Sequence, residues 1–209
     1  SLWMSLKTAV VGIPMGGGKG GISVDPKALT ERQLEGLSRE YARRIFDILG
    51  PNKDVPAPDV NTNPKIIDWM IDEYIQVAKK NGVKTPINKL YATFTGKAKN
   101  GLAGRTEATG FGGVVVLKEL AKKLKLDPKN TTVAVMGFGN VGYYFADLAS
   151  KAGFKVVAVS DSRGGIIKKI KDDFVALDIP LVYECKNEKG SLNGCYCAGG
   201  VCDTRGGQL

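Results

Sequence analysis

The sequence predicts an α/β protein, and three features of its 209 residues support that prediction. Hydrophobic residues make up 43% of the chain, which is enough to bury a core. In the first half, apolar residues recur three and four apart within residues 30–50 and again from residue 64 onward, as in amphipathic helices. In the second half, β-branched runs at 131–135 and 156–159 flank a glycine-rich turn, which is typical of a strand–helix–strand unit.

The first element is a glycine-rich loop at residues 16–21, with Lys19 inside it and Lys7 upstream. Glycines let a substrate approach the Lys19 ammonium closely, so we expect this side chain to be partly desolvated. A buried, tunable lysine suits chemistry on a carbonyl or an imine. A phosphate-binding P-loop does not fit, because Ile13 and Gly20 stand where that motif needs glycine and a hydroxyl residue. A solvated lysine in an ordinary turn stays open as the alternative.

A short strand end and an amphipathic helix are expected next. Residues 22–24 lead into an Asp-Pro turn and are interpreted as the end of a strand. Thr30 and Gln33 have the spacing of a capping box, which predicts that a helix begins at Thr30. The apolar spacing continues to Gly50, where we expect this helix to end.

The following loop carries a candidate functional carboxylate. Residues 54–63 are punctuated by prolines and contain Asp59. Asn63 and Pro64 are typical of a helix N-terminus, so a second helix should begin there. Asp59 therefore lies on a loop that enters a helix, a common place for a functional group.

The second half has the order of elements found in a dinucleotide-binding unit. A glycine-rich connector at 95–104 leads into an expected helix at 105–124. A strand at 131–135 then runs into the sequence GFGNVG at 137–142, and the next strand ends at Asp161. Strand, glycine turn, helix, strand and acidic residue follow one another at about the spacing of a Rossmann-type site.

Each glycine in this turn has a physical role. Gly137 permits the tight turn, Gly139 lets a pyrophosphate approach the backbone, and Gly142 allows close packing of helix on strand. The helix N-terminus supplies unpaired N–H groups for phosphate. Asp161 can bind ribose hydroxyls and would repel a 2′-phosphate, which slightly favours NAD. Because Arg163 could serve NADP instead, the choice between the two cofactors stays open.

Composition narrows the function classes further. The formal net charge is +9, but the lysines occur as scattered pairs beside acidic residues, so we expect no nucleic-acid partner. No segment has the roughly 18 apolar residues of a membrane span, and the N-terminus SLWMSLK lacks the features of an export signal. We therefore expect a cytoplasmic protein without a membrane partner. The absence of histidine excludes histidine-based triads and most mixed His/Cys metal sites.

All four cysteines lie in the last segment, at Cys185, Cys195, Cys197 and Cys202. The last three could bind a soft metal, but the sequence has no paired CxxC motifs. We therefore expect no metal site, and free thiols in a reducing compartment.

Five segments of the chain match one known family. KTAVVGIPMGGGKGGISVDP, VPAPDVNTNP, GRTEATGFG, VAVMGFGNVG and VVAVSDSRGGI, in this order, closely resemble the glutamate dehydrogenases of archaea and many bacteria. The resemblance covers nearly all of residues 1–190. It implies oxidative deamination of L-glutamate to 2-oxoglutarate and ammonia, with hydride transfer to NAD or NADP, in a two-domain homohexamer. The leucine, phenylalanine and valine dehydrogenases, which share both glycine motifs, are the alternative, although the APDVNTN context favours the glutamate branch.

The resemblance also implies roles for single residues. Lys7 is similar to the lysine that binds the substrate α-carboxylate, Lys19 to the lysine that activates water and stabilises the carbinolamine, and Asp59 to the proton-transferring aspartate. Thr109 and Asn140 match positions that contact the dinucleotide, with Thr109 near the nicotinamide amide. The residues expected to hold the cofactor are Thr109, Gly137, Gly139, Asn140, Val141, Gly142 and Asp161.

Compared with this family, the chain is expected to be incomplete in both domains. Residues 1–103 would be a substrate and catalytic domain that lacks its upstream segment. Residues 104–190 would be the first half of a Rossmann-type dinucleotide-binding domain, and residues 191–209 an irregular tail rich in cysteine and glycine. A non-catalytic fragment is therefore a further alternative, because half a sheet leaves an unpaired strand edge and an exposed apolar face.

Overall fold

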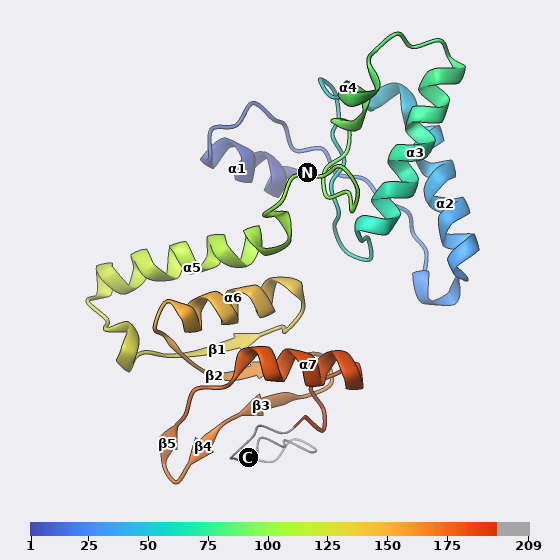
Figure 1. The fold of residues 1–209 in the computed structure, drawn as a ribbon. Helices are drawn as coiled ribbons and strands as arrows, with labels where there is room; N and C mark the ends of the chain where they lie inside the picture. The colour runs from blue at the N-terminus through green and yellow to red at the C-terminus, as the bar shows by residue number, and fades with distance from the viewer. Residues whose placement is uncertain (196–209) are drawn as a thin grey trace. The chain divides into compact units, whose positions relative to one another are not determined.

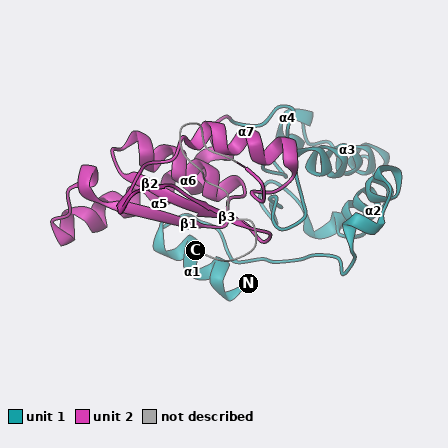
Figure 2. Cartoon of the chain, turned by 90° about the horizontal axis from the view of Figure 1, so that it is seen from below, with its two compact units in different colours: residues 1–102 teal, residues 103–209 magenta. Residues whose placement is uncertain are grey.

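The computed structural model describes residues 1–195, and the predicted α/β class is confirmed (Figure 1). The chain divides into two compact units, residues 1–102 and residues 103–209 (Figure 2). The first unit is built from helices, and the second combines helices with a small sheet. None of the helices in the described part of the chain is long and apolar enough to cross a bilayer.

The first unit contains four α-helices and two short 3₁₀ turns. These are α1 (Leu2–Val10), η1 (Pro26–Ala28), α2 (Glu31–Arg44), η2 (Phe46–Ile48), α3 (Pro64–Lys80) and α4 (Ile87–Tyr91). The strand end predicted at residues 22–24 is wrong, because this stretch is extended but hydrogen-bonds to no neighbouring strand. A β-strand needs a partner for its backbone groups, and the described part of this unit has only one isolated bridge, between Leu49 and Asp54.

The capping box predicted at the start of α2 is confirmed. The Gln33 amide N–H donates to Thr30 Oγ1 at 3.3 Å, and the Thr30 N–H donates to Gln33 Oε1 at 2.9 Å. The predicted end at Gly50 is wrong, since α2 ends at Arg44 and the chain tightens into η2. A 3₁₀ turn still places apolar residues three apart, so the sequence spacing could not distinguish it from further α-helix.

The core of the first unit lies between α2 and α3. Asn63 caps α3 as predicted, with its Oδ1 accepting from the Ile66 N–H at 3.0 Å. The buried side chains of this core are Ala42, Leu49, Ile66, Ile67, Met70, Ile71, Tyr74, Ile75, Ala78, Leu90 and Phe94. At the edge of the core, Arg43 reaches the largely buried Glu73 carboxylate at 2.7 Å, so that a charged pair also joins the two helices.

The second unit begins with the helix predicted at 105–124 and contains the predicted strands. Its elements are α5 (Arg105–Leu124), η3 (Pro128–Asn130), β1 (Thr132–Met136), α6 (Asn140–Lys151), β2 (Lys155–Ser160), β3 (Gly165–Ile167), β4 (Lys169–Ile170), β5 (Asp173–Phe174) and α7 (Ile179–Lys189). β1 pairs with β2 in parallel, β2 pairs with β3 antiparallel, and β4 and β5 form a separate hairpin. The parallel β1–α6–β2 unit is the one that the glycine motif predicted.

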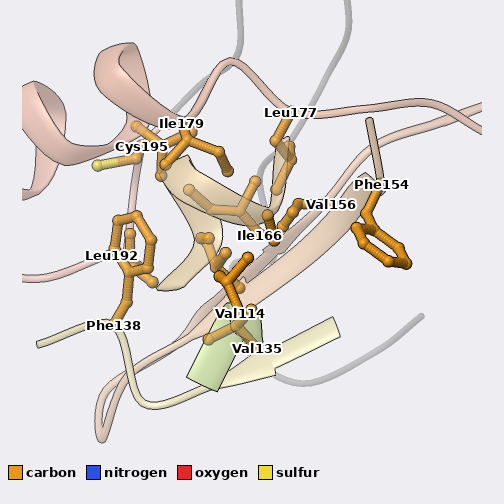
Figure 3. Close-up of a cluster of buried hydrophobic side chains, with 14 of the residues drawn as sticks. Val114, Val135, Phe138, Phe154, Val156, Ile166, Leu177, Ile179, Leu192 and Cys195 are labelled. Carbon is orange, nitrogen blue, oxygen red and sulfur yellow. The ribbon is translucent and has the colours of Figure 1, made fainter. Parts of the chain in front are cut away.

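The core of the second unit lies between this sheet and the helices that cover it. Figure 3 shows Val114 of α5, Val135 of β1, Val156 of β2, Ile166 of β3 and Ile179 of α7 in one buried cluster. On one side of the sheet, α5 packs closely on α6. Burial of these aliphatic side chains is the main source of stability for the unit, since each contributes roughly 1.5–3 kcal/mol.

The close contact between α5 and α6 depends on Gly110. A Cβ at this position would lie 2.6 Å from the Phe145 backbone N and 2.7 Å from Tyr144 Cβ, and neither atom can move away cheaply. We expect Gly110→Ala to lower the free energy of unfolding of the second unit by about 1–3 kcal/mol. Denaturant unfolding followed by circular dichroism measures the change.

A matched control lies on the same helix. A Cβ at Gly112 meets nothing within 4 Å, so Gly112→Ala gains helix propensity without a clash and should raise the free energy of unfolding by up to about 1 kcal/mol. Equal effects of the two substitutions would show that the α5–α6 contact is looser than these distances imply.

The prediction of free thiols is wrong for two of the four cysteines. Cys185 on α7 and Cys195 in the turn after it form a disulfide, with their Cα atoms 5.8 Å apart. The turns at residues 191–194 fold the chain back on α7, which the sequence spacing did not reveal. Cys197 and Cys202 lie outside the described residues, as does most of the tail predicted at 191–209.

Candidate active-site residues

Lys19 and Asp59 form an ion pair in the first unit, although they lie 40 residues apart in the sequence. Lys19 comes from the glycine-rich loop and Asp59 from the loop before α3. Asp59 is held in a tight turn, in which its own N–H donates to Thr62 Oγ1 at 2.6 Å and the Val60 N–H donates to Asp59 Oδ1 at 2.9 Å. The two side chains that the sequence singled out for catalysis are therefore in contact.

Close approaches fix the course of the glycine-rich loop. A Cβ on Gly17 would lie 2.2 Å from Ser5 Oγ and 2.4 Å from the Ser5 backbone N, so the loop packs directly on α1. Gly20 directly follows Lys19, and a Cβ on Gly20 would lie 2.7 Å from the Tyr41 hydroxyl. These contacts favour glycine at positions 17 and 20, whereas a Cβ on Gly18 would make only an ordinary contact, 3.5 Å from Asp54 Oδ1.

The environment of the pair is more open than expected. The side chains of Lys19 and Asp59 are 51% and 52% exposed. The prediction that Lys19 is partly desolvated is therefore wrong for the described chain. An ion pair with this exposure contributes at most about 1 kcal/mol to stability. Its significance is therefore positional, because it holds a proton donor and a proton acceptor together.

Lys7 lies apart from the pair on α1. The Lys7 side chain is exposed, and its ammonium forms no ion pair or hydrogen bond with any residue in the described range 1–195. A cation on an exposed helix face is free to bind an anion. The structure thus brings Lys19 and Asp59 together and leaves Lys7 available.

In the second unit, the glycine turn has the conformation that its sequence predicts. Gly137 has a φ of 92°, which favours glycine, and its N–H donates to the Ser160 carbonyl at the end of β2 at 2.9 Å. A Cβ on Gly142 would lie 1.8 Å from the Gly137 carbonyl oxygen, so α6 packs directly on the turn. At Gly139, the space that a Cβ would occupy is open within 4 Å.

The N-termini of α5 and α6 are linked beside this turn. Asn140 Nδ2 donates to the Thr106 carbonyl at 2.7 Å, which ties the first residue of α6 to the first turn of α5. Thr109 is exposed on α5, and Val141 is exposed on α6. Helix N-termini attract anions, so this corner of the unit is suited to a phosphate group.

Asp161 turns its carboxylate into the protein. Oδ1 accepts from the N–H groups of Arg163 at 2.9 Å and Gly164 at 3.1 Å, and Oδ2 accepts from the Leu192 N–H at 2.9 Å. Burial by itself raises the pKa of the Asp161 carboxyl, but these N–H groups and the charge of Lys186 outweigh burial, so the pKa lies below its ordinary value. The side chain is only 11% exposed.

Lys186 is a residue that the sequence reasoning missed. Its ammonium donates to the Phe138 carbonyl in the middle of the glycine turn and lies 3.6 Å from Asp161 Oδ2. It therefore joins α7 to the ends of both parallel strands. Lys186 lies 48 residues after Phe138 in a helix without a motif, so no local signal could have identified it.

Two family models match the chain. Residues 1–76 match the Glu/Leu/Phe/Val dehydrogenase dimerisation domain, and residues 101–205 match Glutamate/Leucine/Phenylalanine/Valine dehydrogenase. The paired Lys19 and Asp59 and the β1–α6–β2 unit agree with these matches. The chain belongs to the glutamate, leucine, phenylalanine and valine dehydrogenase family.

Within this family, two proteins similar to this chain are glutamate dehydrogenases. The NADP-specific glutamate dehydrogenase of Synechocystis is 40% identical over 205 residues, which are 97% of this chain and 45% of that protein. The NAD-specific glutamate dehydrogenase of Peptoniphilus asaccharolyticus is 48% identical over 163 residues, which are 77% of this chain and 37% of that protein. The resemblance to glutamate dehydrogenases is confirmed.

The solved structures agree. A hetero-hexameric glutamate dehydrogenase of Thermus thermophilus superposes with a TM-score of 0.80 at 35% identity, covering 94% of this chain and 44% of that one. The glutamate dehydrogenase of Peptoniphilus asaccharolyticus gives a TM-score of 0.72 at 41% identity, covering 92% and 47%. The fold is therefore that of a substrate domain followed by the first half of a Rossmann-type domain, and the chain spans less than half the length of the relatives it matches.

Proposed function

We propose that the protein containing this chain oxidatively deaminates L-glutamate to 2-oxoglutarate and ammonia, using NAD or NADP. The observation that carries the proposal is the contact between Lys19 and Asp59, which places an ammonium and a carboxylate side by side on two loops of the first unit. The names of the relatives support glutamate over leucine, phenylalanine or valine as the substrate.

The chemistry needs an anchor for the amino acid and a pair of groups that move protons. Lys7 binds the α-carboxylate through a charge-assisted hydrogen bond. Lys19 holds and activates the water that adds to the imine carbon, and its ammonium stabilises the resulting carbinolamine. Asp59 accepts a proton and returns it when ammonia leaves, for which its contact with Lys19 is suited.

The residues of the second unit fit a dinucleotide. Open space at Gly139 admits a pyrophosphate to the backbone, and the first turn of α6 presents N–H groups that donate to no partner within residues 1–195. Gly137, Gly142 and Asn140 shape this corner, while Thr109 and Val141 border it. When bound, the nicotinamide supplies the acceptor for the hydride of the α-carbon.

The remaining attributes follow from the same proposal. We infer a homohexamer in the cytoplasm, with glutamate and 2-oxoglutarate as its small-molecule partners and with neither nucleic acid nor membrane as a partner. The Thermus thermophilus relative is a hetero-hexamer, which supports a hexameric assembly. We place the boundary between the substrate domain and the dinucleotide-binding domain at residues 103–104.

The test compares this 209-residue chain with the same sequence placed within a protein of full family length. We expect glutamate-dependent formation of NADH or NADPH by the longer protein and no measurable turnover by the chain alone. Hydride transfer needs the nicotinamide within a few ångströms of the α-carbon, and a misplacement of about 1 Å can already cost about 10²-fold in rate. Absorbance at the reduced-nicotinamide band measures both rates. Robust turnover by the chain alone would contradict the fragment interpretation, and no turnover by the longer protein would refute the proposed activity.

Substitution of Lys7 tests the substrate anchor in the longer protein. We expect Lys7→Ala to raise the KM for glutamate by about 10- to 100-fold, because a charge-assisted hydrogen bond worth about 1.5–3 kcal/mol is lost. Steady-state kinetics measure the change, and Lys27→Ala, which removes an exposed lysine from η1, is the control. An unchanged KM and kcat in Lys7→Ala would remove Lys7 from the site.

A further inference from the structure

The turn after β2 indicates which residue reads the ribose of the cofactor, an inference that rests on the proposed function. In a Rossmann-type unit, the ribose lies beyond the carboxyl end of β2, where an acidic residue usually accepts hydrogen bonds from its hydroxyls. Asp161 occupies that place in the sequence. In the structure, three backbone N–H groups already donate to its carboxylate, and the side chain is 11% exposed.

The negative charge of Asp161 is also compensated. The ammonium of Lys186 lies 3.6 Å from Oδ2. Three of the roughly four lone-pair positions of the carboxylate already accept N–H groups, and Lys186 lies beside Oδ2, which has the remaining one. A ribose hydroxyl would therefore compete with that ammonium for a single position. Asp161 therefore shapes the turn between β2 and β3 rather than presenting an acceptor to a ligand.

The same turn exposes a different group. Residues 161–164 connect β2 to β3, with Ser160 opposite Gly165 in the register and the Asp161 N–H donating to the Gly164 carbonyl at 2.8 Å. Arg163 stands in this turn with an exposed side chain, and its guanidinium has no partner among residues 1–195. The turn is thus closed by Asp161 and carries a free cation.

This cation lies at the edge where a dinucleotide would bind. The Gly137 N–H donates to the Ser160 carbonyl at 2.9 Å, which ties the glycine turn to the residue that precedes the β2–β3 turn. The parallel pairing of Met136 with Ser160 places both turns at the carboxyl ends of β1 and β2. If the pyrophosphate of a dinucleotide lies over the glycine turn, its adenosine ribose therefore lies beside Arg163.

We propose that Arg163 selects a 2′-phosphate on the adenosine ribose, so that this site takes NADP in preference to NAD, and that Asp161 is a positioning residue for the turn. A guanidinium offers two parallel N–H donors that match the oxygens of a phosphate. Because Lys186 and backbone N–H groups compensate the charge of Asp161, the repulsion that an acidic residue would exert on a 2′-phosphate is weakened. The slight preference for NAD expected from Asp161 is thereby reversed.

The experiment measures the affinity of the 209-residue chain for two probes that carry only the adenosine half of the cofactor. Adenosine 2′,5′-bisphosphate and adenosine 5′-monophosphate differ by the 2′-phosphate alone, and calorimetry or NMR titration gives both dissociation constants. We expect the bisphosphate to bind about 10- to 100-fold more tightly. We expect Arg163→Ala to remove that difference and to leave the affinity for the monophosphate unchanged.

Two further variants separate a specific role of Arg163 from general effects. Lys155→Ala removes an exposed cation from the opposite end of β2 and should leave the ratio of the two affinities unchanged. Asp161→Asn keeps an acceptor for the turn but removes the charge. Asp161→Asn should leave the ratio of the two affinities near its original value. If Asp161 instead bound the ribose, the substitution would weaken binding of the monophosphate.

Four results would overturn the proposal: equal affinities for the two probes, tighter binding of the monophosphate, an unchanged ratio in Arg163→Ala, or no binding of either probe. None of these results depends on glutamate or on Lys7, Lys19 and Asp59. The deamination assay can therefore fail while the probe preference holds, or the reverse, and the two proposals are judged separately.

Discussion

Replacing Lys19 by alanine or Asp59 by asparagine is expected to reduce glutamate turnover by about 10²- to 10⁴-fold in a protein of full family length, because each change removes a group that moves a proton. Both side chains belong to loops of the first unit, whereas the glycine turn expected to bind the cofactor belongs to the second. The affinity for NAD or NADP should therefore change little. Steady-state kinetics at saturating glutamate, together with a cofactor titration, measure the two quantities.

The double variant gives a sharper result than either single one. If Lys19 and Asp59 act as a unit through their contact, the losses should not multiply. Turnover in Lys19→Ala/Asp59→Asn should then be only slightly lower than in the less active of the two single variants. Lys65→Ala is the matched control, since it breaks another exposed ion pair of the same unit, with Glu31 at 2.7 Å, and should leave turnover unchanged. Near-normal turnover in either single variant would refute the assignment.

The sequence predicted the elements whose signals are local. The reciprocal hydrogen bonds of Thr30 and Gln33, the cap at Asn63 and the helix from Arg105 to Leu124 all follow from residues within one turn of the element they define. The end of α2 could not be predicted in this way. A 3₁₀ turn at Phe46–Ile48 continues the apolar pattern, and the sequence has no separate sign for it.

The candidate site shows the same division. The glycine turn could be recognised because the backbone requires glycine at Gly137 and Gly142, and the contacts that impose this requirement lie within six residues of each other. The orientation of Asp161 could not, because one of its three N–H partners, Leu192, lies 31 residues further along. Lys186 and the Cys185–Cys195 pair likewise depend on how α7 and the following turn pack on the sheet, which no spacing encodes. The resemblance identified Lys19 and Asp59, and the structure adds that they touch.

Two glycines of the glycine turn, Gly139 and Gly142, should differ strongly in how much stability they lose when replaced by alanine. A Cβ at Gly142 would lie 1.8 Å from the Gly137 carbonyl oxygen and 3.4 Å from Val135 Cγ1, so either α6 or the turn must shift. We expect Gly142→Ala to destabilise the second unit by about 3 kcal/mol or more, the upper range for overpacking, despite a gain of up to about 1 kcal/mol in helix propensity. At Gly139, where φ is −83° and the space is open, Gly139→Ala should change stability by less than about 1 kcal/mol.

The readout for this comparison must report on the second unit alone. Both tryptophans, Trp3 and Trp69, lie in the first unit, so their fluorescence would follow the wrong transition. Hydrogen exchange of the amides in β1 and β2 reports directly on the sheet, because its rate follows the free energy of opening. In Gly142→Ala, protection of these amides should fall by about 10²-fold, which is the stability loss converted at about 1.4 kcal/mol per factor of ten. Unchanged protection would mean that α6 and the turn can separate without cost, and loss of protection in Gly139→Ala would mean that the open space beside Gly139 is needed for the fold as well as for a ligand.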